Sequence, residues 1–464
     1  MATTDLRQRA PFDRKFYAFY IAFVASLGGF LFGYDLVIIS GAQIFVRDQF
    51  GLTPQQFGFA TSSALLGCIA GPFLGARICD RFGRKAALLL AAMLFAVGAV
   101  GTAVARDITD FNLFRILGGI GVGLASLASP MYIAEVAPAK ARGRLGLMYQ
   151  LAITVGAVAA TIVSYFLARD MAPTIAWRWM FASVIAPVVV FSLLLIRLPA
   201  SPRWLAEKRR FSEALALLSR IGGEEDGRRE MTEIESSMHT EVGNFRELLR
   251  PGMRAAVATG IILAVLNNWT GWTGIAFYLP TLFQLAGYTK ASDAIAQNVL
   301  VMAGTVLLTL ISIWLVDRVG RRPLWITCSA AMCVFLVLTG VLFQRNATGG
   351  AVVLVVFLCA IPHAMALGPL PWLMMSEIYP TRLRAKAVSL STTLLWVAGF
   401  TGPLAFPMLE SLSERIFHSI AGVFWLYSCI CLFSFIWGWK FLPETRGRSL
   451  ENIAISWQRG SHNV

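Results

Sequence analysis

Stretches of about 20 hydrophobic residues alternate with short polar stretches along most of the chain. A helix of that length spans a lipid bilayer, and backbone amides in lipid must find their hydrogen-bond partners within the same segment. A transmembrane β-barrel would instead need alternating segments of about 10 residues, which the sequence does not show. We therefore expect an all-α integral membrane protein. The pattern predicts twelve helices, at residues 16–40, 54–77, 86–105, 111–134, 145–168, 176–198, 255–284, 295–316, 323–343, 351–376, 387–408 and 418–441.

One long hydrophilic stretch separates the first six predicted helices from the last six. Within it, residues 211–221 have helical spacing and are followed by Gly222 and Gly223, which end a helix, and a second short helix is expected near residues 229–238. We therefore expect five parts: an N-terminal tail at 1–15, a six-helix bundle at 16–198, a connector with short helices at 199–253, a second six-helix bundle at 254–441 and a C-terminal tail at 442–464.

The charged residues are few and unevenly placed. Only 14% of the 464 residues are charged, against about 25% in soluble domains. Thirty-two of the forty Lys and Arg residues lie on the side of the membrane that holds the tails, seven lie on the other side, and Arg115 lies inside a predicted helix. Positive residues concentrate on the cytoplasmic side, so we expect both tails and the connector in the cytoplasm. The net charge of +14 does not predict nucleic-acid binding, because no basic face exists apart from these loops.

The sequence carries none of the patterns expected of an enzyme or a metal protein. It has no P-loop, no HExxH pattern and no nucleophile with a matching base. The seven cysteines lie in or beside hydrophobic stretches, without CxxC or other metal-ligand spacing. We expect no enzymatic activity, no cofactor and no bound metal.

A charged hexapeptide recurs in the two halves of the chain. Residues 80–85 read Asp-Arg-Phe-Gly-Arg-Lys and residues 317–322 read Asp-Arg-Val-Gly-Arg-Arg, each in a short polar gap between two hydrophobic stretches. Such repeats indicate a duplicated bundle, and duplicated bundles carry solutes by rocking one half against the other. Two weaker repeats have nearly the same offset: Glu135-Val-Ala-Pro138 with Glu377-Ile-Tyr-Pro380, and Pro199-Ala-Ser-Pro202 with Pro443-Glu-Thr-Arg446.

The repeated motifs place acids and bases together at the cytoplasmic mouth. Within the first half, Asp80 and Arg84 can pair with Glu135 and Arg142, and ion pairs at this mouth can hold a gate shut and break when it opens. Exposed pairs contribute only about 0–1 kcal/mol each, so a network is needed. Anchoring by positive residues also explains the Lys and Arg residues, but not the paired acids. The candidate gate residues are Asp80, Arg81, Gly83, Arg84, Glu135, Arg142, Asp317, Arg318, Gly320, Arg321, Glu377, Arg384 and Glu444.

Seven motifs carry a resemblance that covers nearly the whole chain: Gly33-Tyr-Asp35, Asp80-Arg-Phe-Gly-Arg84, Arg115-Ile-Leu-Gly-Gly-Ile-Gly-Val-Gly123, Pro130-Met-Tyr-Ile-Ala-Glu135, Pro202-Arg-Trp204, Asp317-Arg-Val-Gly-Arg321 and Pro443-Glu-Thr-Arg-Gly447. As a set they resemble the sugar porter family of the major facilitator superfamily. The chain is similar to bacterial proton-coupled symporters, including xylose–proton symporters, and to animal glucose facilitators. The resemblance implies two six-helix bundles, alternating access and one central sugar site. One departure is Ala200, where the family commonly has glutamate.

Asp35 and Arg115 are ionisable residues inside predicted membrane helices. Both lie in the outer part of the first bundle at similar depth, where opposite charges neutralise each other and isolated charges are costly. A simpler interpretation is that both side chains reach the outer membrane boundary. The resemblance implies a proton switch, because symporters have an acid at the position of Asp35 and passive facilitators lack it. Protonation of Asp35 would then free Arg115 and couple protons to the sugar.

The same resemblance points to a central sugar site. Sugars present hydroxyl groups in many directions and an apolar ring face, which amide and aromatic side chains match. The candidate substrate-binding residues are Phe32, Gln150, Asn267, Asn268, Thr273, Tyr278, Gly368, Trp372 and Trp396. Departures from the family are the shorter amides Asn267 and Asn268 in place of glutamines, Thr273 in place of a third amide and Phe277 in place of tyrosine. Leu395 also stands where xylose symporters have a glutamine. Asn267 and Asn268 can alternatively serve only to hold a broken helix together.

We therefore expect a carrier that imports a sugar or polyol together with protons. A passive sugar facilitator and a carrier of another small organic solute are the alternatives; Asp35 favours symport, whereas Leu395 favours a less polar solute. We expect a multi-pass monomer in the plasma membrane, which is the inner membrane of a bacterium, with both termini cytoplasmic. Its partners would be the solute, protons and the lipid bilayer, and not nucleic acid.

Overall fold

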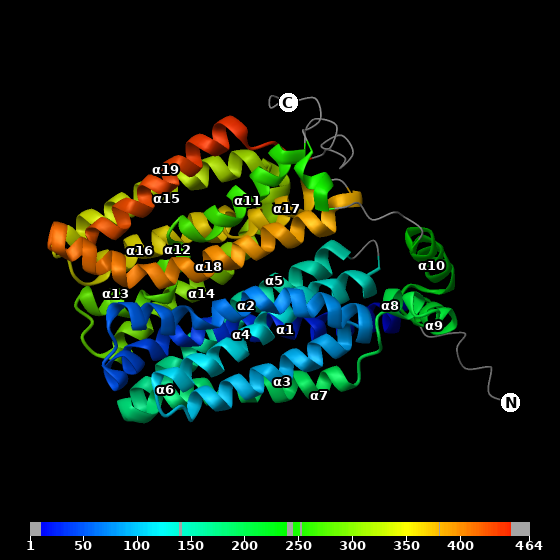
Figure 1. The fold of residues 1–464 in the computed structure, drawn as a ribbon, viewed down its shortest axis with the longest axis horizontal. Coiled ribbons are helices and arrows are strands. Elements are labelled where there is room, and N and C mark those ends of the chain that lie inside the picture. The colour runs from blue at the N-terminus through cyan, green and yellow to red at the C-terminus, as the bar shows by residue number, and fades with distance from the viewer. Residues whose placement is uncertain (1–10, 139–141, 239–244, 251–252, 380, 447–464) are drawn as a thin grey trace.

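The computed structural model describes residues 11–138, 142–238, 245–250, 253–379 and 381–446, and all regular structure within these ranges is helical (Figure 1). The first half contains α1 (Pro11–Phe50), α2 (Pro54–Phe82), α3 (Arg84–Ala103), α4 (Ile108–Val136), α5 (Arg142–Asp170), α6 (Pro173–Ala182) and α7 (Ile185–Ile196). Between the halves lie α8 (Pro202–Glu207), α9 (Phe211–Gly222), α10 (Glu224–Met238) and the 3₁₀ turn η1 (Phe245–Leu249).

The second half is more interrupted than the first. It contains α11 (Met253–Trp269), α12 (Trp272–Phe277), α13 (Leu279–Leu285), α14 (Ala291–Val319), α15 (Arg321–Gln344), α16 (Gly350–Pro362), the π-helical segment η2 (His363–Leu367), α17 (Pro369–Glu377), α18 (Thr381–Phe417) and α19 (Ala421–Phe441). Long helices joined by short turns agree with the hydrophobic pattern, but short helical segments at α12, α13, η2 and α17 interrupt the second half.

The seventh predicted span is not one continuous helix, which corrects the expectation for residues 255–284. In the described residues, eleven helices are long and hydrophobic enough to cross a membrane, and this region is not among them. It is divided into α11, α12 and α13, of 17, 6 and 7 residues. Gly271 has a left-handed φ of 103°, which breaks the helix between α11 and α12, and Pro280, which has no backbone donor, lies in the first turn of α13.

The two ends of the bundle are distinct (Figure 1). We call the end that carries α8, α9 and α10 the connector face; the Gly83 turn between α2 and α3 lies there, against Trp204 of α8. The Gly320 turn between α14 and α15 is the repeat of that turn, and both glycines have a left-handed φ, of 91° and 100°. The other end, which includes the Gly51 turn between α1 and α2, is called the opposite face.

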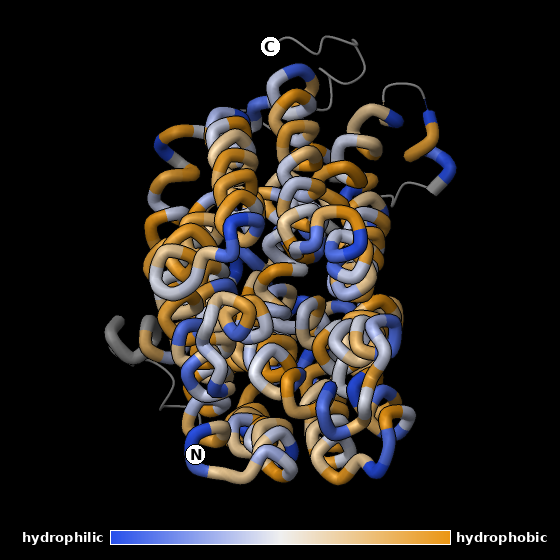
Figure 2. Tube along the Cα trace, turned by 90° about the vertical axis from the view of Figure 1, so that its left-hand side faces the viewer, coloured by the Kyte–Doolittle hydropathy of each residue, from blue (hydrophilic) through white to orange (hydrophobic). Residues whose placement is uncertain are grey.

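The surface of the bundle between these faces is hydrophobic. Large apolar side chains such as Leu193, Leu307 and Val334 are exposed there. Figure 2 looks onto the opposite face and shows hydrophilic residues in the turns and hydrophobic residues along the helices. Water-soluble monomers rarely expose apolar surface on this scale, so the surface is suited to lipid.

The halves meet chiefly through α2 against α18 and α5 against α14. Near the opposite face, α2 approaches α18 so closely that a Cβ at Gly58 would overlap the backbone carbonyl of Leu404. This contact needs a residue without a side chain, and it brings the two halves together at that end.

Candidate functional site

Asp35 on α1 and Arg115 on α4 form a buried ion pair. Nη1 of Arg115 lies 3.1 Å from both carboxylate oxygens of Asp35, and Nη2 donates to the Asp35 carbonyl at 3.3 Å. Each residue is only 2% exposed, so neither reaches the polar boundary of the bundle. The ring of Phe181 on α6 lies 5.2 Å from the guanidinium carbon. A charge removed from water is costly unless it is paired, so loss of the Asp35 charge would leave Arg115 uncompensated.

Three of the predicted aromatic residues meet where the two halves face each other. The ring centroids of Phe32 on α1 and Trp396 on α18 are 5.6 Å apart, and those of Trp396 and Trp372 on α17 are 6.3 Å apart. Trp396 is buried, whereas Trp372 is 38% exposed. Because Phe32 belongs to the first half and both tryptophans to the second, relative movement of the halves changes this cluster.

The amides of Asn267 and Asn268 at the end of α11 bind backbone groups through their nitrogen atoms. Nδ2 of Asn267 donates to the carbonyls of Leu367 at 3.0 Å and Gly368 at 2.8 Å, which join η2 to α17. Nδ2 of Asn268 donates to the carbonyl of Leu395 on α18 at 3.0 Å. Both amides therefore link the end of α11 to neighbouring helices, as expected if Asn267 and Asn268 hold a broken helix together. Each also keeps a carbonyl oxygen that can accept a hydrogen bond from a solute.

The other candidate residues occupy two different environments. Gln150 on α5 and Thr273 on α12 are half-buried. Tyr278, by contrast, is 1% exposed, and its hydroxyl donates to the carbonyl of Pro403 at 2.9 Å. Its ring stacks on Phe406 at 4.6 Å and meets Phe57 of the first half at 5.4 Å. Tyr278 thus belongs to the closed contact near the opposite face.

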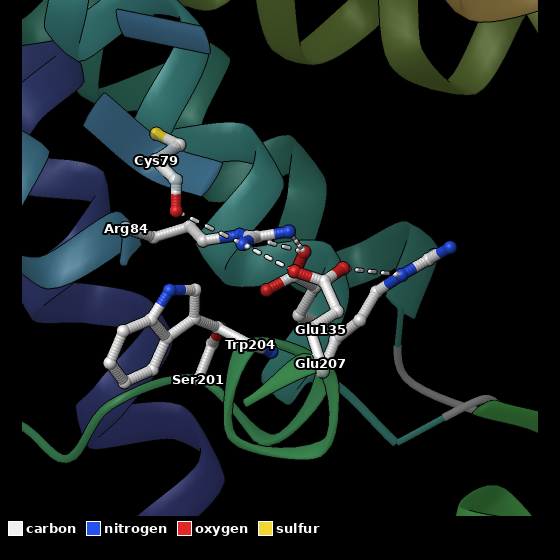
Figure 3. Close-up of polar contacts among 7 residues, drawn as sticks. Cys79, Arg84, Glu135, Ser201, Trp204 and Glu207 are labelled. Atoms are coloured by element: carbon white, nitrogen blue, oxygen red, sulfur yellow. Dashed lines mark hydrogen bonds and ion pairs between the residues drawn. The ribbon is translucent and has the colours of Figure 1, made fainter. Parts of the chain in front are cut away.

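At the connector face of the first half, Arg84 is the centre of a charged cluster (Figure 3). Its Nη2 lies 2.7 Å from Glu135 of α4, its Nη1 lies 3.4 Å from Glu207 of α8, and Nη1 also donates to the carbonyl of Cys79 at 3.3 Å. The Arg84 side chain is buried, and the indole of Trp204 lies against the adjacent Gly83. The expected pairing of Arg84 with Glu135 is present.

The second half repeats the pair of arginine and glutamate and adds a further acid, Glu444, beside it. Nη2 of Arg321 lies 3.0 Å from Glu377, whose other oxygen accepts a hydrogen bond from Thr445 at 2.6 Å. Glu444 accepts from the backbone amides of Arg321 at 3.1 Å and Arg322 at 3.0 Å. Glu444 therefore caps the N-terminus of α15, where a negative charge is favoured.

The remaining gate candidates lie at the edges of these clusters. Asp80 is exposed in the last turn of α2. The side chains of Arg142 and Asp317 lie outside the described residues, so the expected pairing of Asp80 with Arg142 stays a prediction. The other positions are described by their contacts: Arg81 lies over Phe82, Arg318 lies over Trp314, and Arg384 donates to the carbonyl of Tyr379.

Sequence reasoning missed a polar contact between the halves near the opposite face. Nε2 of Gln43 on α1 donates to the carbonyl of Phe277 at 2.7 Å, and Ser40 accepts from Nδ2 of Asn298 on α14 at 3.1 Å. The Ser40 hydroxyl also donates to the carbonyl of Ala276 at 3.3 Å. Ser40 and Gln43 are three residues apart in a hydrophobic helix, and this spacing of polar residues was the available signal.

The family model described as sugar (and other) transporter matches residues 21–457. The arabinose-proton symporter of Bacillus subtilis (strain 168) is 35% identical, covering 98% of each chain, and the D-xylose-proton symporter of Escherichia coli (strain K12) is 34% identical, covering 95% of this chain and 96% of its own. The inward open structure of the xylose transporter XylE from E. coli superposes with a TM-score of 0.84 at 32% identity, covering 95% of this chain and all of the other. With two helical halves, a buried ion pair and a match over most of its length, this chain belongs to the sugar (and other) transporter family.

Proposed function

We propose that the chain imports a sugar or polyol together with protons, by exposing one central site to each side of the membrane in turn. The observation that carries this proposal is the buried Asp35–Arg115 pair, which lies in the same half as Phe32 of the central aromatic cluster. Protonation of Asp35 would cancel its attraction for Arg115 and release α1 from α4. The relatives named as arabinose- and xylose-proton symporters support the same coupling.

The substrate side of the proposal rests on the central side chains. Phe32, Trp372 and Trp396 offer flat apolar surfaces, and the free oxygens of Asn267 and Asn268 offer acceptors for hydroxyl groups. This mixture of aromatic faces and a few polar atoms suits a small sugar or polyol, whose ring is apolar and whose edge is polar.

We place the connector face in the cytoplasm and infer that this structure is the inward-facing state. Hydrogen bonds join the halves near the opposite face, at Ser40 and Gln43, whereas Arg84 and Arg321 pair with glutamates of their own half or of the connector. The TM-score of 0.84 to an inward open form, against 0.78 to XylE bound to 6-bromo-6-deoxy-D-glucose, supports this assignment. The protein would act as a monomer in the bilayer.

The test is transport by purified protein in lipid vesicles, with labelled xylose, arabinose and galactose as probes. A pH gradient should drive uptake above equilibrium in the wild-type protein. Asp35→Asn should abolish uphill accumulation and keep exchange of sugar between the two sides, because the asparagine cannot cycle a proton. Asp48→Asn, at an exposed position of the same helix, is the matched control and should accumulate sugar normally.

Accumulation by Asp35→Asn at the wild-type level would exclude the proton role. Wild-type uptake that only equilibrates, with no proton movement, would make the protein a passive facilitator.

A further inference from the structure

The two halves differ in how the first turn of the helix after the repeated motif is capped. Glu444 accepts hydrogen bonds from the first two amides of α15, and its carboxylate lies against Gly320. The repeated sequence Pro-x-Ser/Thr aligns Glu444 with Ala200, which has no carboxylate. The ring of Trp204 lies against Gly83 instead. No side-chain acceptor binds the first amides of α3 in the part of the chain that the structure describes.

We propose that Glu207 of α8 substitutes for the acid that is absent at position 200, and that it is a positioning residue for Arg84. One oxygen of Glu207 lies 3.4 Å from Nη1 of Arg84, on a guanidinium whose Nη2 holds Glu135. Its other oxygen lies 3.7 Å from Nε of Arg203. Glu207 thus ties the connector to the Gly83 turn through Arg84, whereas Glu444 ties its own segment to the Gly320 turn through backbone amides.

The substitution changes the strength of the tie. The Arg84 side chain is 4% exposed but that of Glu207 is 34% exposed, so water and salt screen their attraction. Glu444 binds two fixed backbone donors at the end of a helix, a geometry that requires less ordering of side chains. The contact between Glu207 of α8 and Arg84 is therefore easier to break than the contact between Glu444 and the amides of α15. This inference rests on the proposed function, in which the connector face opens and closes during each cycle.

The experiment measures hydrogen exchange of the α8 amides in the purified wild-type protein, in Glu207→Gln and in Ala200→Glu/Glu207→Gln. The reporters are the amides of Leu205 in α8 and of its C-cap Lys208, which donate to the carbonyls of the N-cap Ser201 and of Trp204. Glu207→Gln should speed their exchange about fivefold, as loss of a half-exposed charged contact predicts. The double variant should restore the wild-type rate, because a glutamate at position 200 is placed to cap α3.

Glu213→Gln is the matched control. Glu213 pairs at 2.7 Å with Arg210, an exposed residue of the connector itself, so α8 exchange should not change. The amides at the start of α15 report on the whole fold, and a rise there equal to that in α8 would mean general unfolding and overturn the proposal. Unchanged α8 exchange in Glu207→Gln, or failure of the double variant to restore it, would also overturn it. Hydrogen exchange is measured without transport, so failure of this proposal can be distinguished from failure of the proposed function.

Discussion

The opposite face and the connector face are held by different kinds of contact. Near the opposite face, Ser40 and Gln43 of the first half share hydrogen bonds with Asn298 and Phe277 of the second, and backbones touch at Gly58. At the connector face, the clusters of Arg84 and Arg321 each lie within one half and its flanking segment. Contacts across the halves exist only while that end is closed, whereas contacts within a half can persist through the cycle. The contacts across the halves therefore determine which conformational state is populated, and the contacts within one half stabilise the structure of that half.

The largest effect is expected where backbones touch across the halves. Gly58→Leu would place a side chain against the carbonyl of Leu404, so the opposite face could not close. We expect sugar uptake into vesicles to fall by at least about tenfold, because the closed state would become rare. The distance between spin labels at Asp48 and Leu412, exposed residues of the two halves near this face, should lengthen.

Gly402→Leu is the control for that variant. Gly402 lies on α18 close to Leu404, but a Cβ there meets no neighbouring atom within 4 Å. Uptake by Gly402→Leu should stay near the wild-type rate. Equal loss in both variants would mean that the effect arises from α18 itself and not from the contact between halves.

A smaller effect is expected from the polar contact. Gln43→Met keeps the length of the side chain and removes the hydrogen bond to Phe277, which is worth about 1 kcal/mol. The population open at the opposite face should rise about fivefold, as the same spin labels would record. Gln56→Met, at an exposed cap of α2, should leave the populations unchanged. If the spin-label distances in Gln43→Met stay unchanged, the hydrogen bond from Gln43 to Phe277 does not stabilise the closed opposite face.

The smallest effect is expected within one half. Glu444→Ala removes the cap of α15 and should lower the free energy of unfolding by about 1 kcal/mol, measured by thermal unfolding in detergent. Spin-label distances at the opposite face should not move. Glu224→Ala, which removes an exposed pair with Arg228 in α10, should cost less than about 0.5 kcal/mol. A large conformational shift in Glu444→Ala would break the distinction between the two faces.

The fold was predictable because lipid allows few solutions for the backbone. Hydrophobic stretches of the right length fix the helices, and the repeated motifs fix the two halves. The overall hydrophobicity of residues 255–284 predicted one continuous helix, although Asn267 and Asn268 also allowed a broken helix. The left-handed φ of Gly271 shows where the helix breaks.

Part of the geometry of the candidate site was predictable. The similar depth of Asp35 and Arg115 favoured their pairing, because an isolated charge in lipid is costly, although the sequence also allowed both side chains to reach the outer membrane boundary. The direction of the Asn267 amide could not be foreseen, since it depends on carbonyls that η2 frees by departing from α-helical geometry. The role of Glu207 was hidden because it follows the Pro202-Arg-Trp204 motif without being part of it.

In the described residues, the last membrane-spanning helix ends at Phe441, yet the few residues that follow it complete the second half. Glu444 and Thr445 hold the Arg321 cluster from outside the bundle. A polypeptide truncated after α19 would keep its membrane-spanning helices but lose the Glu444 carboxylate that caps the N-terminus of α15. A shortened protein made for expression should therefore keep the residues through Thr445, and a fusion tag should be attached after that residue.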